Sequence, residues 1–421
     1  MALFGALSIG RSGLIINGAA LSVIGNNIAN VGTTGFKGSR TEFSDLVSAD
    51  AGGDIGKIGL GARIGTVRTL FDQGAIEATG RSLDLAIEGQ GFFVLREDQG
   101  NAYTRAGNFK LQPNGVITNL LGFPLQGFPV DGTGTVTGGV TDINVAGAAS
   151  QASPSQNVTI AGNLKADAPL LNSGTFDNTD FTTAYNTSNY QTTIQAFDSL
   201  GAQHQVTLFF TKSATAGQWH VNMGVDDGEL GGTPGALNII GSDDIDFDTN
   251  GVITSADSGG HITTGSFTFT GASAQAINFD LTNFSQLSGQ STVSSVVQDG
   301  FGAGGLSSIS VDPKGVLSAT FDNGQTRPLF QLELAHFNAP EGLSPGGSGI
   351  YRETLDSGPP ALGTPQAGGN GSIVSGALEQ SNVQIASEFI NLISTQRAFQ
   401  ANTRVITASD QLLSDLINII R

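Results

Sequence analysis

The side chains best suited to ligand chemistry lie in a short acidic loop in the middle of the chain. Asp246, Asp248 and Asn250 alternate ahead of Gly251, and Asp257 stands at the twelfth position. This spacing is typical of calcium-binding loops, in which carboxylate and amide oxygens surround the cation. The flanking residues have the pattern of strands rather than of the helices that such a loop joins, so a simple turn is the favoured interpretation. We predict no metal and no cofactor, and a calcium site stays open as the alternative.

Other reactive sites are incomplete or open. Lys57 lies in a glycine-rich run, but a phosphate-binding loop needs Gly and Ser or Thr where the chain has Ala51 and Ile58. No two of the four histidines have the spacing of metal ligands on one helix face, so we expect them to be exposed or hydrogen-bonded. A pair of carboxylates acting as acid and base stays open, because sequence does not show which side chains meet. We predict that the protein is not an enzyme, and that Trp219 lies in a core.

The composition excludes several classes of protein. The 421 residues include 18 basic and 36 acidic side chains, a formal net charge of −18, which argues against binding to nucleic acid or to an anionic membrane surface. There is no Cys, so disulfides, thiol nucleophiles and Cys-ligated zinc are excluded. The charge is uneven, since residues 111–330 hold 4 basic and 18 acidic side chains, a net of −14. We predict no contact with nucleic acid and no insertion into a membrane.

The first thirty residues have the spacing of a coiled-coil helix. Leu7, Leu14, Leu21 and Ile28 recur every seven residues, and Ile24 occupies a second seam position. Several glycines interrupt this stretch, and each costs about 1 kcal/mol in a helix interior relative to Ala. An isolated helix here is therefore marginal and needs a partner.

The end of the chain has a second and stronger pattern of this kind. Its apolar residues follow the four-three spacing of a coiled-coil seam, and they are Ile385, Phe389, Leu392, Phe399, Ile406, Leu413 and Ile417. Long helices with an apolar face at both ends of a chain need to pack against each other or against neighbouring copies. We predict that the apolar residues of both helices drive self-assembly.

Between the helices the chain has the short alternating runs of β-strands, separated by Gly, Asn, Asp and Ser. One turn recurs at 112–118, 248–254 and 312–318, each time with Gly at its fourth position, where a positive φ is required. We predict an α+β fold, in which long terminal helices pair as a coiled coil around two nested, mainly-β domains. The outer domain is expected to be an inserted β-barrel or sandwich.

Shifts in composition near 147–157 and 357–371 suggest the division into domains. The predicted parts are a terminal helical coiled-coil domain (1–31 and 383–421), an extended connecting segment (32–72 and 358–382), a β-rich inner domain (73–147 and 300–357) and an inserted acidic β-rich outer domain (148–299).

The run from Gly25 to Lys37 resembles a segment of the bacterial flagellar rod and hook protein family. The residues that carry this motif are Asn26, Asn27, Ala29, Asn30, Gly35, Phe36 and Lys37. Segments 83–93, 103–109, 376–383 and 396–402 also look like this family. The resemblance covers about 1–130 and 300–421 and is weak in the middle. Glycines recur through 32–72, so we predict that this motif and the segment after it act as a hinge.

The resemblance implies a structural subunit of a hollow helical polymer. Within this family the chain looks like the hook-type members. Rod members resemble it at both ends but are usually much shorter, since they lack a large inserted domain. This resemblance implies a subunit that polymerises into the curved tubular hook, a flexible universal joint that transmits motor torque from rod to filament. A distal rod subunit of the basal body is the alternative. The implied fold is a radial stack, with paired helices forming the inner tube.

The resemblance also implies where the protein acts and what it contacts. The expected location is the extracellular part of the bacterial flagellum, reached through the flagellar type III export apparatus without signal-peptide cleavage. The expected partners are other copies of the chain, rod proteins at the base, hook–filament junction proteins at the tip and the hook cap during assembly. An enzyme or a calcium-binding surface protein is the competing class, and its site would lie in the middle domain.

Overall fold

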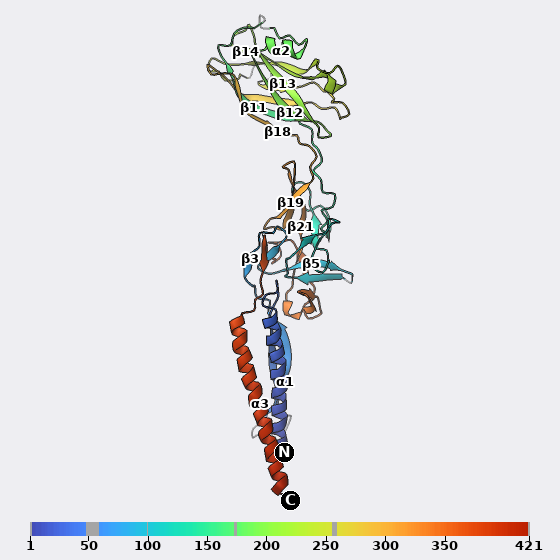
Figure 1. Ribbon diagram of the computed structural model, residues 1–421, viewed down its shortest axis with the longest axis vertical. Helices are drawn as coiled ribbons and strands as arrows, with labels where there is room; N and C mark the ends of the chain where they lie inside the picture. Colours follow the sequence, from blue (N-terminus) through green and yellow to red (C-terminus); the bar gives the residue numbers. More distant parts are fainter. Residues whose placement is uncertain (1, 48–58, 99, 172–174, 255–258, 420–421) are drawn as a thin grey trace. The chain divides into compact units, whose positions relative to one another are not determined.

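The computed structural model describes residues 2–47, 59–98, 100–171, 175–254 and 259–419. Its first element is helix α1 (Ala2–Ala29) and its last is helix α3 (Ile385–Ile419), and several β-sheets lie between them in the sequence (Figure 1). The predicted α+β fold with long terminal helices is therefore confirmed. The N-terminal helix ends two residues earlier than predicted, so Val31 lies beyond it.

The chain divides into two compact units. Unit 1 consists of Met1–Gly147, Ser308–Thr320 and Thr326–Arg421, and unit 2 consists of Ala148–Ser307 and Phe321–Gln325. Unit 2 is thus formed almost entirely by one continuous stretch inserted into the sequence of unit 1. The finer division into four parts stays a prediction.

Unit 1 contains a hairpin, two larger sheets and three short ladders. The hairpin pairs β1 (Ser39–Val47) with β2 (Gly59–Thr69). The six-stranded sheet has the order β23 (Ser344–Gly347), β24 (Ile350–Arg352), β6 (Gly100–Thr104), β5 (Phe92–Glu97), β22 (Leu334–His336) and β25 (Ala361–Gly363). The five-stranded sheet has the order β10 (Thr141–Asp142), β9 (Gln126–Pro129), β21 (Thr326–Leu332), β20 (Val316–Phe321) and β19 (Leu306–Val311).

Two of the three short ladders join distant parts of the sequence, and the third is local. β26 (Ser372–Ser375) pairs with β4 (Leu85–Glu88), β27 (Ala377–Glu379) pairs with β3 (Ile76–Ala78), and β7 (Lys110–Leu111) pairs with β8 (Ile117–Thr118). A single-turn 3-10 helix, η3 (Pro340–Gly342), follows β22. The first two ladders bring the chain leading out of α1 next to the chain leading into α3.

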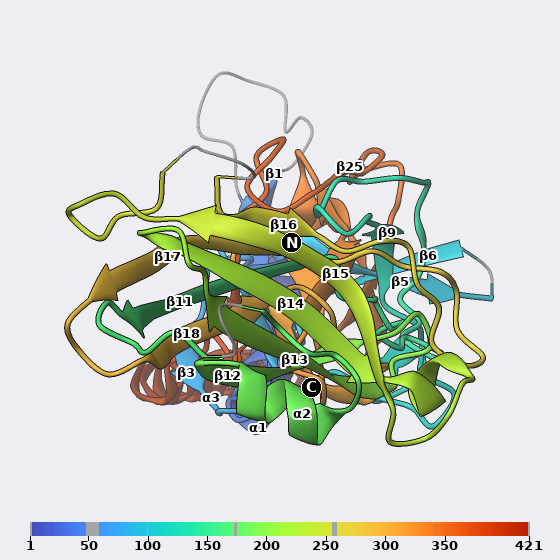
Figure 2. The same ribbon diagram turned by 90° about the horizontal axis from the view of Figure 1, so that it is seen from above.

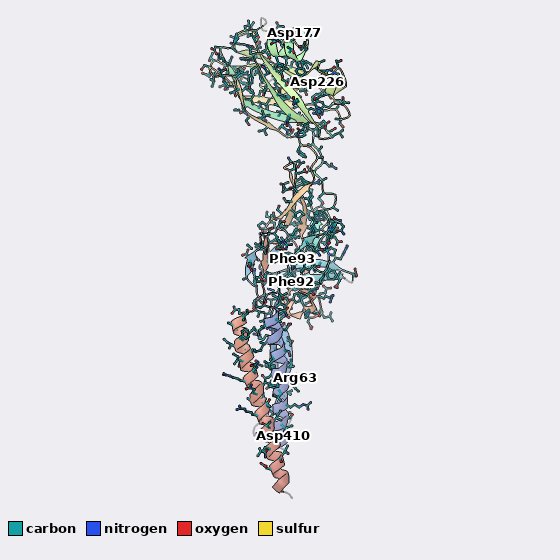
Figure 3. All side chains as sticks on the ribbon, in the orientation of Figure 1. Arg63, Phe92, Phe93, Asp177, Asp226 and Asp410 are labelled. Carbon is teal, nitrogen blue, oxygen red and sulfur yellow. The ribbon has the colours of Figure 1, made fainter. Side chains whose placement is uncertain are left out.

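Aromatic side chains fill the core of unit 1. Phe92 and Phe93 lie on β5 in the β-rich part of this unit (Figure 3). The Phe92 ring meets Phe337 edge to face with centroids 5.8 Å apart, and the Phe93 ring meets Phe109 at 5.1 Å. Edge-to-face pairs are favourable because the positive ring edge meets the negative ring face.

Glu333, between β21 and β22, is a titratable group buried in unit 1. The residue is buried, and its Oε1 atom has no hydrogen-bond partner. Burial raises the pKa of this carboxyl to about 7 from the ordinary 4.5, because the charged form loses its hydration.

We expect the pKa of Glu333 to make unit 1 less stable as the pH rises from about 4.5 through 7. In that window the unfolded carboxyl ionises while the folded one keeps its proton, and the loss is on the order of 3 kcal/mol by linkage. Glu333→Gln stays uncharged, so its free energy of unfolding is expected to exceed that of the unchanged chain at about pH 8 and to match it at about pH 4. Urea unfolding across this range checks the result, and parallel pH profiles for the two chains would contradict it.

Unit 2 is a sandwich of two four-stranded sheets. One sheet has the order β16 (His261–Thr263), β17 (Asn278–Leu287), β11 (Asn157–Lys165) and β18 (Thr292–Gln298). The other has the order β12 (Tyr190–Phe197), β13 (Gln203–Lys212), β14 (Gln218–Asp226) and β15 (Leu237–Asp246). Figure 2 shows β13, β14 and β15 side by side. The short helices of this unit are α2 (Phe181–Thr187) and η2 (Asp227–Leu230).

One apolar core joins the two sheets of unit 2. Val158 on β11 and Phe279 on β17 share a cluster of buried residues with Val206 on β13 and Trp219 on β14. Of the two predicted architectures, the β-barrel and the sandwich, the structure thus shows the sandwich. Trp219 is fully buried, as predicted.

The recurring turn has the same geometry at all three places. Gly115, Gly251 and Gly315 have φ angles of 80°, 76° and 74°. In each turn the amide of this Gly donates to the carbonyl three residues earlier, at 2.8, 3.0 and 2.9 Å. The positive φ explains why Gly occupies the fourth position each time.

Candidate assembly site

The two terminal helices pack against each other through a row of small residues. By the rise of an α-helix, α1 and α3 are about 42 and 52 Å long. A Cβ atom built on Gly10 would lie 2.9 Å from Cγ1 of Ile406, and one on Gly13 would lie 2.6 Å from the Asn402 side chain. These contacts run in opposite directions along the two helices, which are therefore antiparallel (Figure 1). Glycine permits the close approach because it has no side chain.

The predicted self-assembly residues of α1 are only partly covered within one chain. Leu7, Leu14, Leu21 and Ile28 are half-buried, and Ile24 is buried. The residues packed most closely on this helix are instead Gly10, Gly13, Ala20, Ile24 and Asn27. The heptad residues therefore keep apolar surface available for contacts outside the chain.

The predicted self-assembly residues of α3 are more exposed still. Ile385, Phe389 and Phe399 are exposed, whereas Leu392, Ile406 and Leu413 are half-buried. The side chain of Ile417 lies outside the described residues. Exposed apolar surface of this extent on a helix is typical of an interaction site. The role of all these residues in assembly stays a prediction.

The β1–β2 hairpin adds an apolar surface that the sequence analysis missed. It lies along α1, where the amide of Ala62 donates to Oγ of Ser12 at 3.3 Å. Phe43, Leu60, Ile64 and Val67 are exposed on it. The sequence was interpreted as an extended connecting segment because of its glycines, although apolar residues do recur along it.

α1 also contains one stretch, Leu7–Ala29, that is long and apolar enough to cross a membrane by length and composition alone. The absence of insertion into a membrane stays a prediction. Its mean hydropathy is 1.4, and it includes the face that packs against α3. A helix of a soluble assembly passes the same test when its apolar face is covered by protein.

The motif residues after α1 are held by specific hydrogen bonds. Nδ2 of Asn27 donates to the carbonyl of Ser39 at 2.8 Å, and the Ser39 amide donates to Oδ1 of Asn27 at 2.9 Å. Helix α1 ends at Ala29, and Asn30 is the next residue. Nδ2 of Asn30 donates to the carbonyl of Asn26 at 2.9 Å. Asn27 thus fixes the start of β1 against the end of α1.

Gly35 lies where two segments come too close for a side chain. Its φ is 66°, and a Cβ atom would lie 2.6 Å from the backbone nitrogen of Ala106. Its amide donates to the carbonyl of Glu379 at 2.7 Å. Phe36 is half-buried beside it. Only Gly satisfies both the positive φ and the close approach.

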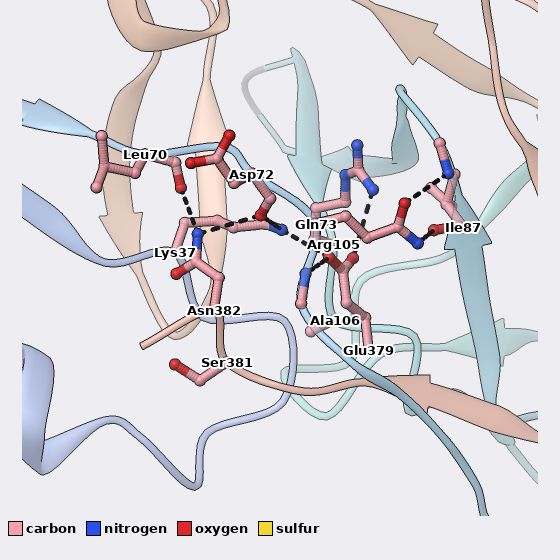
Figure 4. A network of polar contacts seen from close by, with 12 residues as sticks. Lys37, Leu70, Asp72, Gln73, Ile87, Arg105, Ala106, Glu379, Ser381 and Asn382 are labelled. Carbon is pink, nitrogen blue, oxygen red and sulfur yellow. Dashed lines mark hydrogen bonds and ion pairs between the residues drawn. The ribbon is translucent and has the colours of Figure 1, made fainter. Parts of the chain in front are cut away.

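The last motif residue, Lys37, belongs to a buried ion cluster with Glu379 and Arg105 (Figure 4). Nζ of Lys37 lies 2.6 Å from Oε1 of Glu379 and donates to the carbonyl of Asp72 at 2.8 Å. Nη1 of Arg105 lies 3.4 Å from Oε2 of the same carboxylate. The side chains of Lys37 and Glu379 are fully buried, and that of Arg105 is 4% exposed.

Burial governs the electrostatics of this cluster. It lowers the pKa of Lys37 and of Arg105, because the charged forms lose their hydration, while the charge of Glu379 opposes both shifts. The Glu379 carboxylate also accepts from the amide of Gly74 at 2.9 Å. A single carboxylate therefore holds two cations and one backbone amide.

Asn382 completes the junction between the chain segments. The amide of Gly38 donates to its Oδ1 at 2.8 Å, and its Nδ2 donates to the carbonyl of Leu70 at 2.8 Å (Figure 4). Together with the ion cluster, these contacts fasten residues 35–38, 70–74 and 379–382. The hinge function of the motif stays a prediction, and these bonds show that its last residues are anchored.

Sequence analysis did not identify Arg105, Glu379 or Asn382 as functional residues. All three lie in segments that carried the resemblance, 103–109 and 376–383. Arg105 and Glu379 are also the only charged residues of these two segments of the sequence. An isolated charge in each segment was the signal available.

In the candidate calcium loop, the Asp248 carboxylate bonds to backbone amides of the same turn. Oδ1 of Asp248 accepts from the amides of Asn250 and Val252 at 2.8 and 2.9 Å, and the bond from Val252 is the main cause of a lowered pKa for Asp248. Asp257 lies outside the described residues, as do Ala51, Lys57 and Ile58 of the phosphate-loop candidate. Within the described ranges, no three His, Asp or Glu side chains gather closely enough to hold a metal ion.

The histidines of unit 2 have carboxylate neighbours. Nδ1 of His204 lies 2.9 Å from Glu229 and its Nε2 lies 3.3 Å from Asp198, and His220 bonds to Asp244. The expectation of exposed or hydrogen-bonded histidines is confirmed for these two.

Family models match four stretches of the chain. They are described as a flagella basal body rod protein (7–37), the flagellar hook protein FlgE/F/G D1 domain (86–165), the flagellar basal body protein FlaE D2 domain (163–301) and the flagellar basal body rod FlgEFG protein C-terminal region (374–419). The motif segment, helix α3 and the part of α1 from Leu7 onward fall within these matches.

Full-length relatives carry one name. The flagellar hook protein FlgE of Escherichia coli is 32% identical, over 98% of this chain and 100% of its own length. The proteins of that name from Salmonella typhimurium and Brucella suis are also 32% identical, over 97% and 100% of this chain and 98% and 100% of their own lengths.

Proposed function

We propose, from the premise that this chain belongs to the flagellar hook protein family, that its terminal helices join one copy to the next in the hook. The chain is a structural subunit of the extracellular flagellar hook, a polymer that links to the rod. Its relatives are structural proteins, and we propose no catalytic role for it. The distal rod alternative has less support, because the full-length relatives are hook proteins.

The observation that carries the proposal is the incomplete burial of the helix pair. Small residues let α1 and α3 approach closely, while Ile385, Phe389 and Phe399 stay exposed on α3. A helix pair that is marginal alone gains stability when neighbouring copies cover its apolar rows. Such a contact is heterologous, since it joins different surfaces of the two copies. When it does not close into a ring, repeating it produces a helical filament.

Further parts of the proposal concern bending and assembly. The segment 32–72 is proposed as the compliant joint. The acidic surface of unit 2 is proposed to keep the polymer soluble. We also propose export through the type III apparatus without cleavage, and contacts with the cap and the junction proteins. A map of a curved filament tests the joint, which requires that conformational differences among subunits concentrate in 32–72.

Removing residues 383–421 is expected to abolish polymerisation and leave a soluble monomer. The truncation deletes α3 but retains Glu379 and Asn382 at the junction. Sedimentation and electron microscopy measure assembly. Trp219 is the only Trp in the sequence and lies in the core of unit 2, so its fluorescence reports whether that unit is folded. Filaments formed by a truncated chain with a native Trp219 signal would show that the helices are not the polymerising element.

A further inference from the structure

A cavity of about 230 Å³ lies beside the buried ion cluster of unit 1. Its lining includes Phe71, Phe92, Phe337 and Arg105, together with the exposed residue Asn338. The cavity therefore combines an aromatic surface with one buried cation. That combination is typical of a site for an anionic group attached to an apolar stem.

The guanidinium group of Arg105 is poorly satisfied by its own chain. Among the described residues it makes one hydrogen bond, the long one of 3.4 Å from Nη1 to Glu379. Its Nε atom is buried without any partner. The guanidinium group also lies over the Phe92 ring, whose centroid is 5.3 Å away, and interacts electrostatically with Tyr351. Since Arg offers five N–H donors, most of its hydrogen-bonding capacity is unused.

The buried charges do not balance. Lys37 and Arg105 supply two positive charges, and Glu379 supplies the single buried negative charge. Asp72 contributes its backbone carbonyl to Lys37, and its exposed carboxylate also attracts the Lys37 charge, so Arg105 is the cation that depends on Glu379 alone. An unpaired buried charge is costly unless an opposite charge approaches it. The cluster therefore favours an additional anion on the side of Arg105.

We propose that this cavity binds a carboxylate side chain from a second copy of the chain, as an assembly contact within the hook. The inference rests on the proposed function, because a homopolymer surrounds each subunit with copies of itself. The chain has 36 acidic and 18 basic side chains, so the surface that a neighbour presents is rich in carboxylates. A carboxylate matches the fork of N–H donors on a guanidinium group, and its methylene stem suits the aromatic walls.

The test places a carboxylate at the cavity from within the same chain. Asn338→Asp changes the size of the side chain very little and supplies an internal anion that competes with the neighbour. We expect the critical concentration for polymerisation to rise at least about tenfold, since a charge-assisted hydrogen bond between copies is lost. Asn178→Asp adds the same charge on an exposed residue of unit 2 and is expected to polymerise like the unchanged chain.

A density map of the unchanged filament provides the second arm. The proposal requires a carboxylate of a neighbouring copy within hydrogen-bond distance of Arg105. A free anion such as acetate at that position, water alone, or an unchanged critical concentration for Asn338→Asp would each overturn it. These outcomes differ from failure of the proposed function, in which the unchanged chain forms no filament or the chain lacking 383–421 still forms one.

Discussion

Replacing Glu379 with Gln is expected to lower the free energy of unfolding of unit 1 by about 3–5 kcal/mol. The substitution preserves the shape of the side chain but removes the buried negative charge that contacts both Lys37 and Arg105. Two buried cations then remain without a buried counter-charge in contact. The Gly74 amide keeps an acceptor, so the loss reports mainly on charge. Urea unfolding followed by circular dichroism measures it.

Two comparisons make this result specific. Trp219 fluorescence should show unchanged unfolding of unit 2, which does not contain the cluster. Glu97→Gln weakens an exposed bidentate ion pair, in which Nη2 and Nε of Arg352 lie 2.7 and 3.0 Å from the two carboxylate oxygens of Glu97, and is expected to lower stability much less than Glu379→Gln because solvent screens the pair. Equal and small effects of the two substitutions would contradict the assignment of Glu379 as the centre of the junction.

Gly13→Leu is expected to separate α1 from α3 and to prevent filament formation. A Cβ atom added at this position would lie 2.6 Å from the Asn402 side chain, and Leu carries three carbon atoms beyond its Cβ. Overpacking of this kind costs about 1–3 kcal/mol. It outweighs the gain of about 1 kcal/mol in helix propensity that replacing Gly brings. Sedimentation measures assembly, and circular dichroism measures the stability of the helix pair.

Gly18→Leu is the matched control. A Cβ atom on Gly18 would lie more than 4 Å from every atom beyond its chain neighbours and the adjacent backbone of its own helix, so the propensity gain is expected without a clash inside the chain. The monomer should therefore keep or improve its helix pairing. If Gly13→Leu polymerised normally while Gly18→Leu did not, the face of α1 bearing Gly18 rather than the α1–α3 contact would control assembly.

Local sequence patterns predicted the elements and the pairing of the two terminal helices, but not the long-range contacts among the strands. The heptad spacing of Leu7, Leu14 and Leu21 predicted α1, since helix periodicity is a property of neighbouring residues. The three recurring turns were predicted because a positive φ restricts the residue type to Gly. The row formed by Gly10 and Gly13 was interpreted only as a cost to the helix, because the value of a missing side chain depends on the partner helix.

The ion cluster was beyond sequence reasoning for a related cause. Lys37 and Glu379 are 342 positions apart, and the pairing of β27 with β3 brings them together. No local pattern specifies which of the many short strands pair. The apolar face of the β1–β2 hairpin was missed because glycines in 32–72 favoured the interpretation of an extended connection. The apolar surface itself follows from Phe43, Leu60 and Val67.

Electron cryomicroscopy of filaments assembled from the unchanged chain reveals which parts of the subunit join one copy to the next. We predict that α1 and α3 lie at subunit contacts along the inner wall of a tube, with the exposed residues Ile385, Phe389 and Phe399 covered by neighbouring copies. A filament in which these side chains face solvent, and in which subunits join only through their β-rich parts, would contradict it.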